Sequence, residues 1–284
     1  MTKSITPPIP RWRLISFSVL MVLLLFLHLG ERPEQLSYVF TAFGGFPDGA
    51  GATHEIHWFA QGVFVWAILA AVVVQLRRPA AQVGAAWVYG AGTVLMFAMV
   101  LAVADLPSEV VPVVAVAIVI AGIAFVVHPS TWRAKYASVE RPSPSLFALV
   151  AVAAVPLIAY AVGQLDIHTS SGSHDEHHEF GHWIVMAVYA LLVLLFGAVA
   201  AWKVSGWRFP LWTAGLMVAA LGLGSLGITA VSQLSTGWAA LAIAWGVVYI
   251  GVGELQARSP LASAGPQDAT TREPRHGRSR AGAA

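Results

Sequence analysis

The chain has 284 residues, of which 57% are hydrophobic and 11% are charged, less than half the roughly 25% charge of a soluble domain. This composition excludes a soluble globular enzyme, a disordered chain and a nucleic-acid-binding protein. The chain has no cysteine, which excludes disulfides, thiolate metal ligands, iron–sulfur clusters and a cysteine nucleophile.

Apolar runs separated by charged or Gly/Pro-rich breaks predict eight membrane-spanning helices. Each crossing needs about 20 mostly apolar residues. The first run follows two arginines, as in a signal peptide, but it is long for one and has no A-x-A cleavage site, so we count it as a helix. The predicted spans are Leu14–Leu29, His57–Leu76, Val83–Ala104, Val110–Val127, Leu146–Val162, Trp183–Trp202, Pro210–Val231 and Trp238–Gly253.

The distribution of charge predicts the orientation of these spans. With the N-terminus in the cytoplasm, fifteen of the sixteen lysines and arginines fall on the cytoplasmic side, and only Arg32 falls outside. Lysine and arginine near span ends favour the cytoplasmic side of a membrane. We therefore expect a multi-pass protein of the cell membrane, embedded in the lipid bilayer, with both termini in the cytoplasm.

An offset of 125 residues aligns the two halves of the chain. It places His57 and Trp58 on His182 and Trp183, and it also matches Trp87 with Trp212. The fold prediction is therefore an all-α protein with two tandem four-helix repeats, related by a pseudo-twofold axis along the membrane normal. The predicted segments are a cytoplasmic N-terminal segment 1–13, a first repeat 14–128, a cytoplasmic linker 129–144, a second repeat 145–254 and a disordered basic cytoplasmic tail 255–284.

Histidines gather on the predicted outer side of the membrane. Imidazole with carboxylate and no sulfur suits zinc, copper, nickel or iron. The pair His54 and His57 and the pair His178 and His182 have spacings that would place each pair on one helix face. Eight of the ten histidines belong to this group: His28, His54, His57, His168, His174, His177, His178 and His182.

Two of these histidines, His57 and His182, are the central candidates. Each lies beside a tryptophan at the mouth of a span, where ionisable groups are costly and often functional. If the twofold axis brings the second and sixth spans together, the two imidazoles face one another. They could then ligate a haem iron axially, or form a mononuclear zinc, copper or iron site with His54, His178 and Glu179.

The remaining candidates, His174 and His177, are weaker metal ligands. They lie in a His/Asp/Glu-rich loop, and such loops often bind metal only adventitiously. For the central pair the alternatives are an interfacial role, in which each histidine caps a helix or bonds a loop, and a pH sensor without metal.

The segment from His178 to His182 formally matches H-E-x-x-H, the zinc-protease signature. That chemistry needs both histidines within one helix, a glutamate base and a third ligand elsewhere. Here the match begins before the apolar span and contains Gly181. We therefore do not expect a metalloprotease.

The layout of two four-helix halves, with histidine at the outer ends of the second and sixth helices, resembles haem A synthase in outline. That family carries glutamate three residues before each of these histidines, and Glu179-Phe180-Gly181-His182 matches this pattern. The first half departs from it, because His54 stands in the place of the glutamate. The starts of the fourth and eighth helices also lack the family's second histidine. The resemblance implies haem bound between the halves by His57 and His182.

Our leading hypothesis is a membrane protein that holds a transition metal or haem at its outer face, with a redox, haem-handling or metal-handling role. Whether it is an enzyme stays open. The alternatives are a non-catalytic structural or assembly subunit of a membrane complex, which would have other subunits as partners, and a small-solute or ion transporter.

Overall fold

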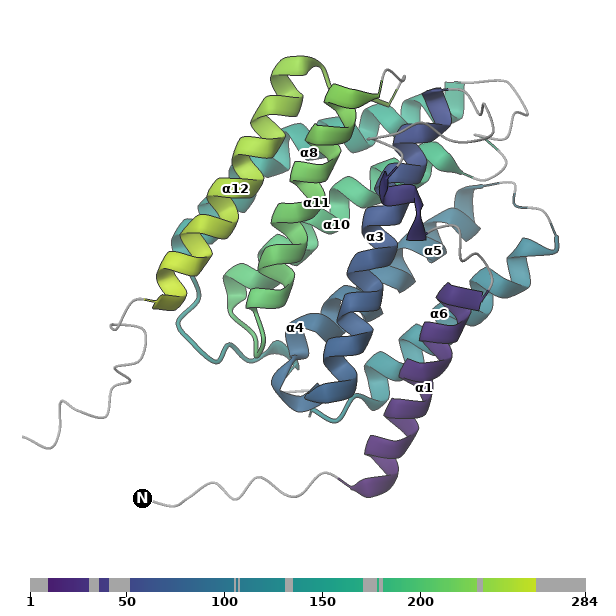
Figure 1. The fold of residues 1–284 in the computed structure, drawn as a ribbon, viewed down its shortest axis with the longest axis vertical. Coiled ribbons are helices and arrows are strands. Elements are labelled where there is room, and N and C mark those ends of the chain that lie inside the picture. The colour runs from purple at the N-terminus through teal and green to yellow at the C-terminus, as the bar shows by residue number, and fades with distance from the viewer. Residues whose placement is uncertain are drawn as a thin grey trace, which may run out of the picture.

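The computed structural model describes residues 10–30, 36–40, 52–104, 106, 108–130, 135–170, 178, 181–228 and 232–258. No strand forms within these residues. An isolated β-bridge between Ser138 and Val204 joins two loops. The all-α class is therefore confirmed. The helices are α1 (Arg11–Gly30), α3 (Ala52–Arg77), α4 (Val83–Ala86), α5 (Gly92–Val103), α6 (Val110–Val127), α8 (Pro144–Ser170), α10 (His182–Trp202), α11 (Arg208–Gly227) and α12 (Thr236–Arg258), shown in Figure 1.

Seven helices in the described residues are long and apolar enough to cross a membrane. They correspond to the second through eighth predicted spans, with α4 and α5 sharing one span. Helix α1 has 20 residues and covers the first predicted span. It is not among these seven helices, and its crossing of the membrane stays a prediction. The chain is accordingly a membrane-embedded, multi-pass helical protein.

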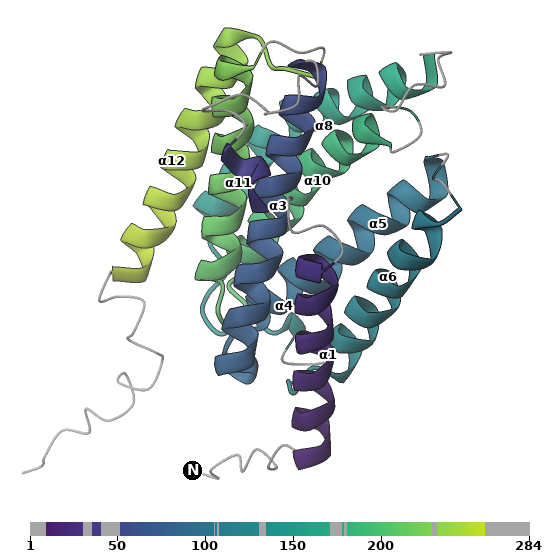
Figure 2. The same ribbon diagram turned by 45° about the vertical axis from the view of Figure 1, so that its right-hand side comes forward.

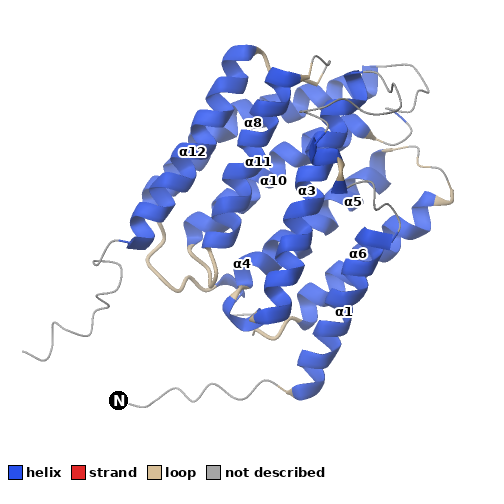
Figure 3. Cartoon of the chain, in the orientation of Figure 1, coloured by secondary structure: helices blue, strands red, loops and turns tan. Residues whose placement is uncertain are grey.

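The long helices run side by side and alternate in direction, so the chain crosses repeatedly between two ends of the bundle (Figures 1 and 2). We call one end the histidine end, because His57, His168, His178 and His182 lie near the starts of α3 and α10 and the end of α8. The opposite end, with the start of α1 and the end of α12, is the arginine end. Loops that join the helices lie at these two ends (Figure 3).

The central helices of the bundle pack against one another. Helix α3 packs against α10 and α11, and α10 packs in turn against α5. The helix bounds repeat with the predicted offset: α3 and α10 end at Arg77 and Trp202, and α4 and α11 begin at Val83 and Arg208. These bounds agree with an internal duplication, which stays a prediction.

Two helices differ from the predicted spans. The third span contains a π-helical turn at Trp87–Ala91, between α4 and α5. Within this turn, a Cβ added at Gly90 would lie 2.6 Å from the Phe125 ring, so only glycine allows this approach. Helix α8 continues to Ser170, well beyond Val162 where its apolar run stops. The extension carries polar side chains to the histidine end.

Basic side chains cap the end of α6 at the arginine end. Lys135 donates through Nζ to the carbonyl oxygens of Phe125 and Val126, and Arg13 donates through Nε to Val127 O over 3.1 Å. These bonds satisfy carbonyls that have no partner inside the helix, and the positive charges suit the negative end of the helix dipole.

The neighbouring residue His128 is fully buried and hydrogen-bonded. Its Nδ1 accepts from Ser130 N over 3.1 Å, so its Nε2 is the donor to Gln75 Oε1, 3.0 Å away. Burial, followed by the charges of Lys135 and Arg13, lowers the pKa of His128 to about 3. His128 is therefore a neutral structural residue.

Candidate functional site

The structure brings His57 and His182 together at the histidine end. Their ring centroids are 5.3 Å apart, and the ring planes are inclined by 41°. His57 lies in the second turn of α3 and is 1% exposed, whereas His182 is the first residue of α10 and is partly exposed. The predicted meeting of these two imidazoles is confirmed.

An aromatic neighbour fixes the ring of His57 from the side. The ring of Trp183 meets it edge-on, with centroids 4.9 Å apart and an angle of 88°. Trp183 is itself buried. The pair of imidazoles is therefore partly shielded from water by the residue that follows His182.

Gly181 determines how the chain enters α10. Its φ of +62° lies in the left-handed region, and a Cβ at this position would come within 2.8 Å of the Cβ of Ala104. Both features require glycine. Because α10 begins only at His182, after this turn, the expectation that His178 and His182 share a helix face is wrong. The structure thereby removes the helical geometry that a zinc protease needs.

A buried polar chain continues from His57 toward α8. His57 Nε2 lies 2.8 Å from Ser232 Oγ, and Ser232 Oγ donates to Gln164 Oε1, also over 2.8 Å. Tyr160 donates its hydroxyl proton to the carbonyl oxygen of Ser232 over 2.7 Å. The segment that precedes α12 is thus bonded at two points to α8, with its serine against His57.

A second pair of histidines stacks at the same end of the bundle. The rings of His168 and His178 are 4.2 Å apart and almost parallel, at 9°. His168 is 2% exposed and lies in the last turn of α8, one turn beyond Gln164. The structure therefore places His178 against His168.

Several predicted ligands fall outside the described residues. These are the side chain of His54 and the residues His174, His177 and Glu179. Among the residues that the structure does describe, no group of three or more histidine, aspartate or glutamate side chains is close enough to hold a metal ion. The described part of the candidate site consists of two imidazoles and the polar chain attached to one of them.

Sequence reasoning missed Gln164 and Ser232 as parts of this site, and it placed His168 in the outer histidine group without predicting its contact with His178. A signal for Gln164 was present, because Tyr160, Gln164 and His168 are spaced by four residues and so lie on one face of a helix. That face was overlooked because the apolar run stops at Val162. Ser232 carries no local signal, since its place depends on how the loop before α12 folds back.

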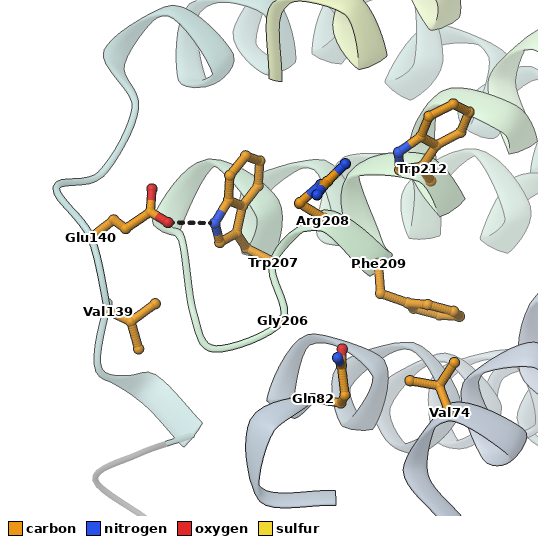
Figure 4. A pocket seen from close by; sticks show the side chains of 9 residues that line it. All are labelled: Val74, Gln82, Val139, Glu140, Gly206, Trp207, Arg208, Phe209 and Trp212. Carbon is orange, nitrogen blue, oxygen red and sulfur yellow. Dashed lines mark hydrogen bonds between the residues drawn. The ribbon is translucent and has the colours of Figure 1, made fainter. Parts of the chain in front are cut away.

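A hollow of about 560 Å³ lies at the arginine end (Figure 4). Its charged groups are already paired: Glu140 accepts from Lys203 Nζ over 3.0 Å and from Trp207 Nε1 over 3.1 Å. Arg208 forms a bidentate ion pair with Glu254, which also accepts a hydrogen bond from Trp212 Nε1. Because these charges are paired with one another, the histidine end is the better candidate for a functional site.

No protein-family model matches the chain, and no curated protein or solved structure matches it either. The geometry of the histidine end is therefore the evidence for a function.

Proposed function

We propose that this membrane protein binds a transition-metal ion at its histidine end, through His57 and His182, and has a metal-handling role. The observation that carries this proposal is the approach of the two imidazoles to 5.3 Å. Neutral imidazole is a common ligand of zinc, copper and iron. By the predicted orientation, the ion would be held on the outer side of the cell membrane.

The separation of the two rings favours an ion over haem. Two imidazole nitrogens bound at about 2.0–2.1 Å to one tetrahedral zinc ion place the ring centroids about 5 Å apart. On opposite sides of a haem iron the centroids would be about 6 Å apart, with the macrocycle between them. The contacts of the His57 ring with Trp183 and Ser232 further limit the space for a macrocycle.

Two imidazoles do not complete a site. A tetrahedral ion takes two further ligands, from protein or water. Glu179, three residues before His182, is the protein ligand that we propose first, because a carboxylate suits the same ions and would offset the positive charge at membrane depth. His54 is the remaining candidate for this role, because the structure stacks His178 on His168 instead.

Titration of metal-free protein tests the proposal. The protein is purified in mild detergent without a nickel column, stripped with chelator and titrated with Zn²⁺ and, separately, Cu²⁺. We expect about one ion per chain for one of these metals, and a loss of affinity in His57→Gln and His182→Gln of more than the 10- to 100-fold typical of a supporting residue. His276→Gln, in the predicted tail, is the matched control and should bind as the wild type does.

Two results would overturn the proposal. Wild-type affinity in both site variants would mean that the histidines are interfacial and would favour the structural-subunit interpretation. Stoichiometric haem in place of an ion, seen as an optical spectrum that the same two variants lose, would assign the pair to haem.

A further inference from the structure

The hydrogen bonds that link His57, Ser232 and Gln164 determine which nitrogen of His57 carries the lone pair. A serine hydroxyl has one proton, and Ser232 gives it to Gln164 Oε1 over 2.8 Å. At the 2.8 Å contact with His57, Ser232 Oγ must therefore accept the hydrogen bond, and His57 Nε2 must donate it. A neutral imidazole with its proton on Nε2 has its lone pair on Nδ1.

We infer that Ser232 and Gln164 are positioning residues that hold His57 in the Nε2-protonated tautomer, so that Nδ1 is the nitrogen offered to the metal. This inference rests on the proposed function. A metal-bound histidine commonly donates its other ring N–H to an oxygen acceptor, which fixes the tautomer and the direction of the ring and strengthens the ligand. Here the acceptor is a serine hydroxyl.

The surroundings make this arrangement rigid. Ser232 is fully buried, and Gln164 is 4% exposed. The Tyr160 hydroxyl donates a hydrogen bond to the backbone carbonyl oxygen of Ser232 over 2.7 Å, which holds this backbone in place. Because Tyr160 and Gln164 are four residues apart on α8, one helix face fixes both the position and the proton of Ser232.

The tautomer is measured on metal-free protein. Histidine is labelled with ¹⁵N, and the spectrum is recorded at about pH 8, above the usual imidazole pKa near 6.5. The His57 signal is assigned as the one lost in His57→Gln. We expect it to report the Nε2-protonated form, and His128, whose hydrogen bonds impose the same form at the opposite end, serves as an internal reference.

Substitutions of Ser232 test whether the tautomer of His57 affects metal affinity. Ser232→Ala should give a mixture of His57 tautomers and a 10- to 100-fold loss of metal affinity. Ser232→Thr, which keeps the hydroxyl, should restore both. The matched control is Ser225→Ala, which removes another buried hydroxyl from this corner, one that accepts from Leu234 N, and it should leave the His57 signal unchanged.

The two proposals fail in different ways. An Nδ1-protonated His57 in the metal-free wild type, or an unchanged tautomer and affinity in Ser232→Ala, overturns the positioning role even if metal binds. Absence of metal binding by the wild type overturns the proposed function, whatever the tautomer.

Discussion

His57 and His182 lie 125 residues apart in sequence, and their imidazole centroids are 5.3 Å apart in the structure. Each occupies the histidine end of a central helix, α3 or α10, and these two helices pack against each other. Two residues far apart in the sequence are thus in contact at the histidine end of the bundle. Ionisable groups are costly at membrane depth, so this pair, with His57 buried and His182 partly exposed, is the feature of the molecule that most needs a functional explanation.

Replacing Gly181 should disturb the start of α10. Gly181→Ala puts a Cβ at a left-handed φ and within 2.8 Å of the Cβ of Ala104, so we expect a loss of about 1–3 kcal/mol in the free energy of unfolding. Thermal unfolding in detergent micelles measures it. The control is Gly163→Ala, which meets nothing within 4 Å in helix α8 and should be neutral or stabilising. Equal stability of the two variants would contradict the argument.

Acid should destabilise the protein through His128. Burial and nearby positive charge hold its folded pKa at about 3, whereas the unfolded chain binds this proton below about pH 6.5. The contribution of His128 to stability is therefore complete above about pH 6.5 and is lost as the pH falls toward 3. Between pH 7 and pH 5 we expect the wild type to lose about 2 kcal/mol more than His128→Gln. Unfolding curves at the two pH values give this difference, and parallel pH dependence in both proteins would refute it.

The ion pair of Lys203 and Glu140 should show coupling at the arginine end. Lys203 is 5% exposed and also lies over the Trp207 ring, so that Glu140→Ala leaves a buried ammonium without its carboxylate. We expect this variant to lose about 1–3 kcal/mol. The double variant Glu140→Ala/Lys203→Met should recover part of the loss, since no unpaired charge remains. A double-mutant cycle of unfolding free energies tests this, and simple additivity would count against a coupled pair.

The orientation of the bundle is open to a direct test because the chain has no cysteine. A single introduced cysteine is then the only thiol of this protein that a membrane-impermeant maleimide can label. Thr169→Cys at the histidine end should be labelled in intact cells, whereas Ala137→Cys at the arginine end should react only after lysis. Both positions are exposed. The reverse pattern of labelling would show that the predicted orientation is inverted.

The spans were predictable because a membrane helix leaves a long apolar run, and no water competes for its backbone. The meeting of His57 and His182 was predicted on the condition that a twofold axis brings the second and sixth spans together, and the two rings are in contact in the structure. The end of α8 was not, because Gly163–Ser170 is polar and its helix is held by packing and by bonds such as the one from Tyr160 to Ser232. The left-handed turn at Gly181 was missed as well, since the spacing of His178 and His182 reads as one helix when backbone angles are unknown.

Metal binding by His57 and His182 is tested most directly by the metal that the protein retains on purification. Wild type and the double variant His57→Gln/His182→Gln are prepared in parallel in mild detergent, without a nickel column, and analysed for all transition metals by mass spectrometry. Metal binding by this pair predicts about one ion per chain in the wild type and almost none in the double variant, with both proteins unfolding at similar temperatures. Equal metal content in the two proteins would contradict it.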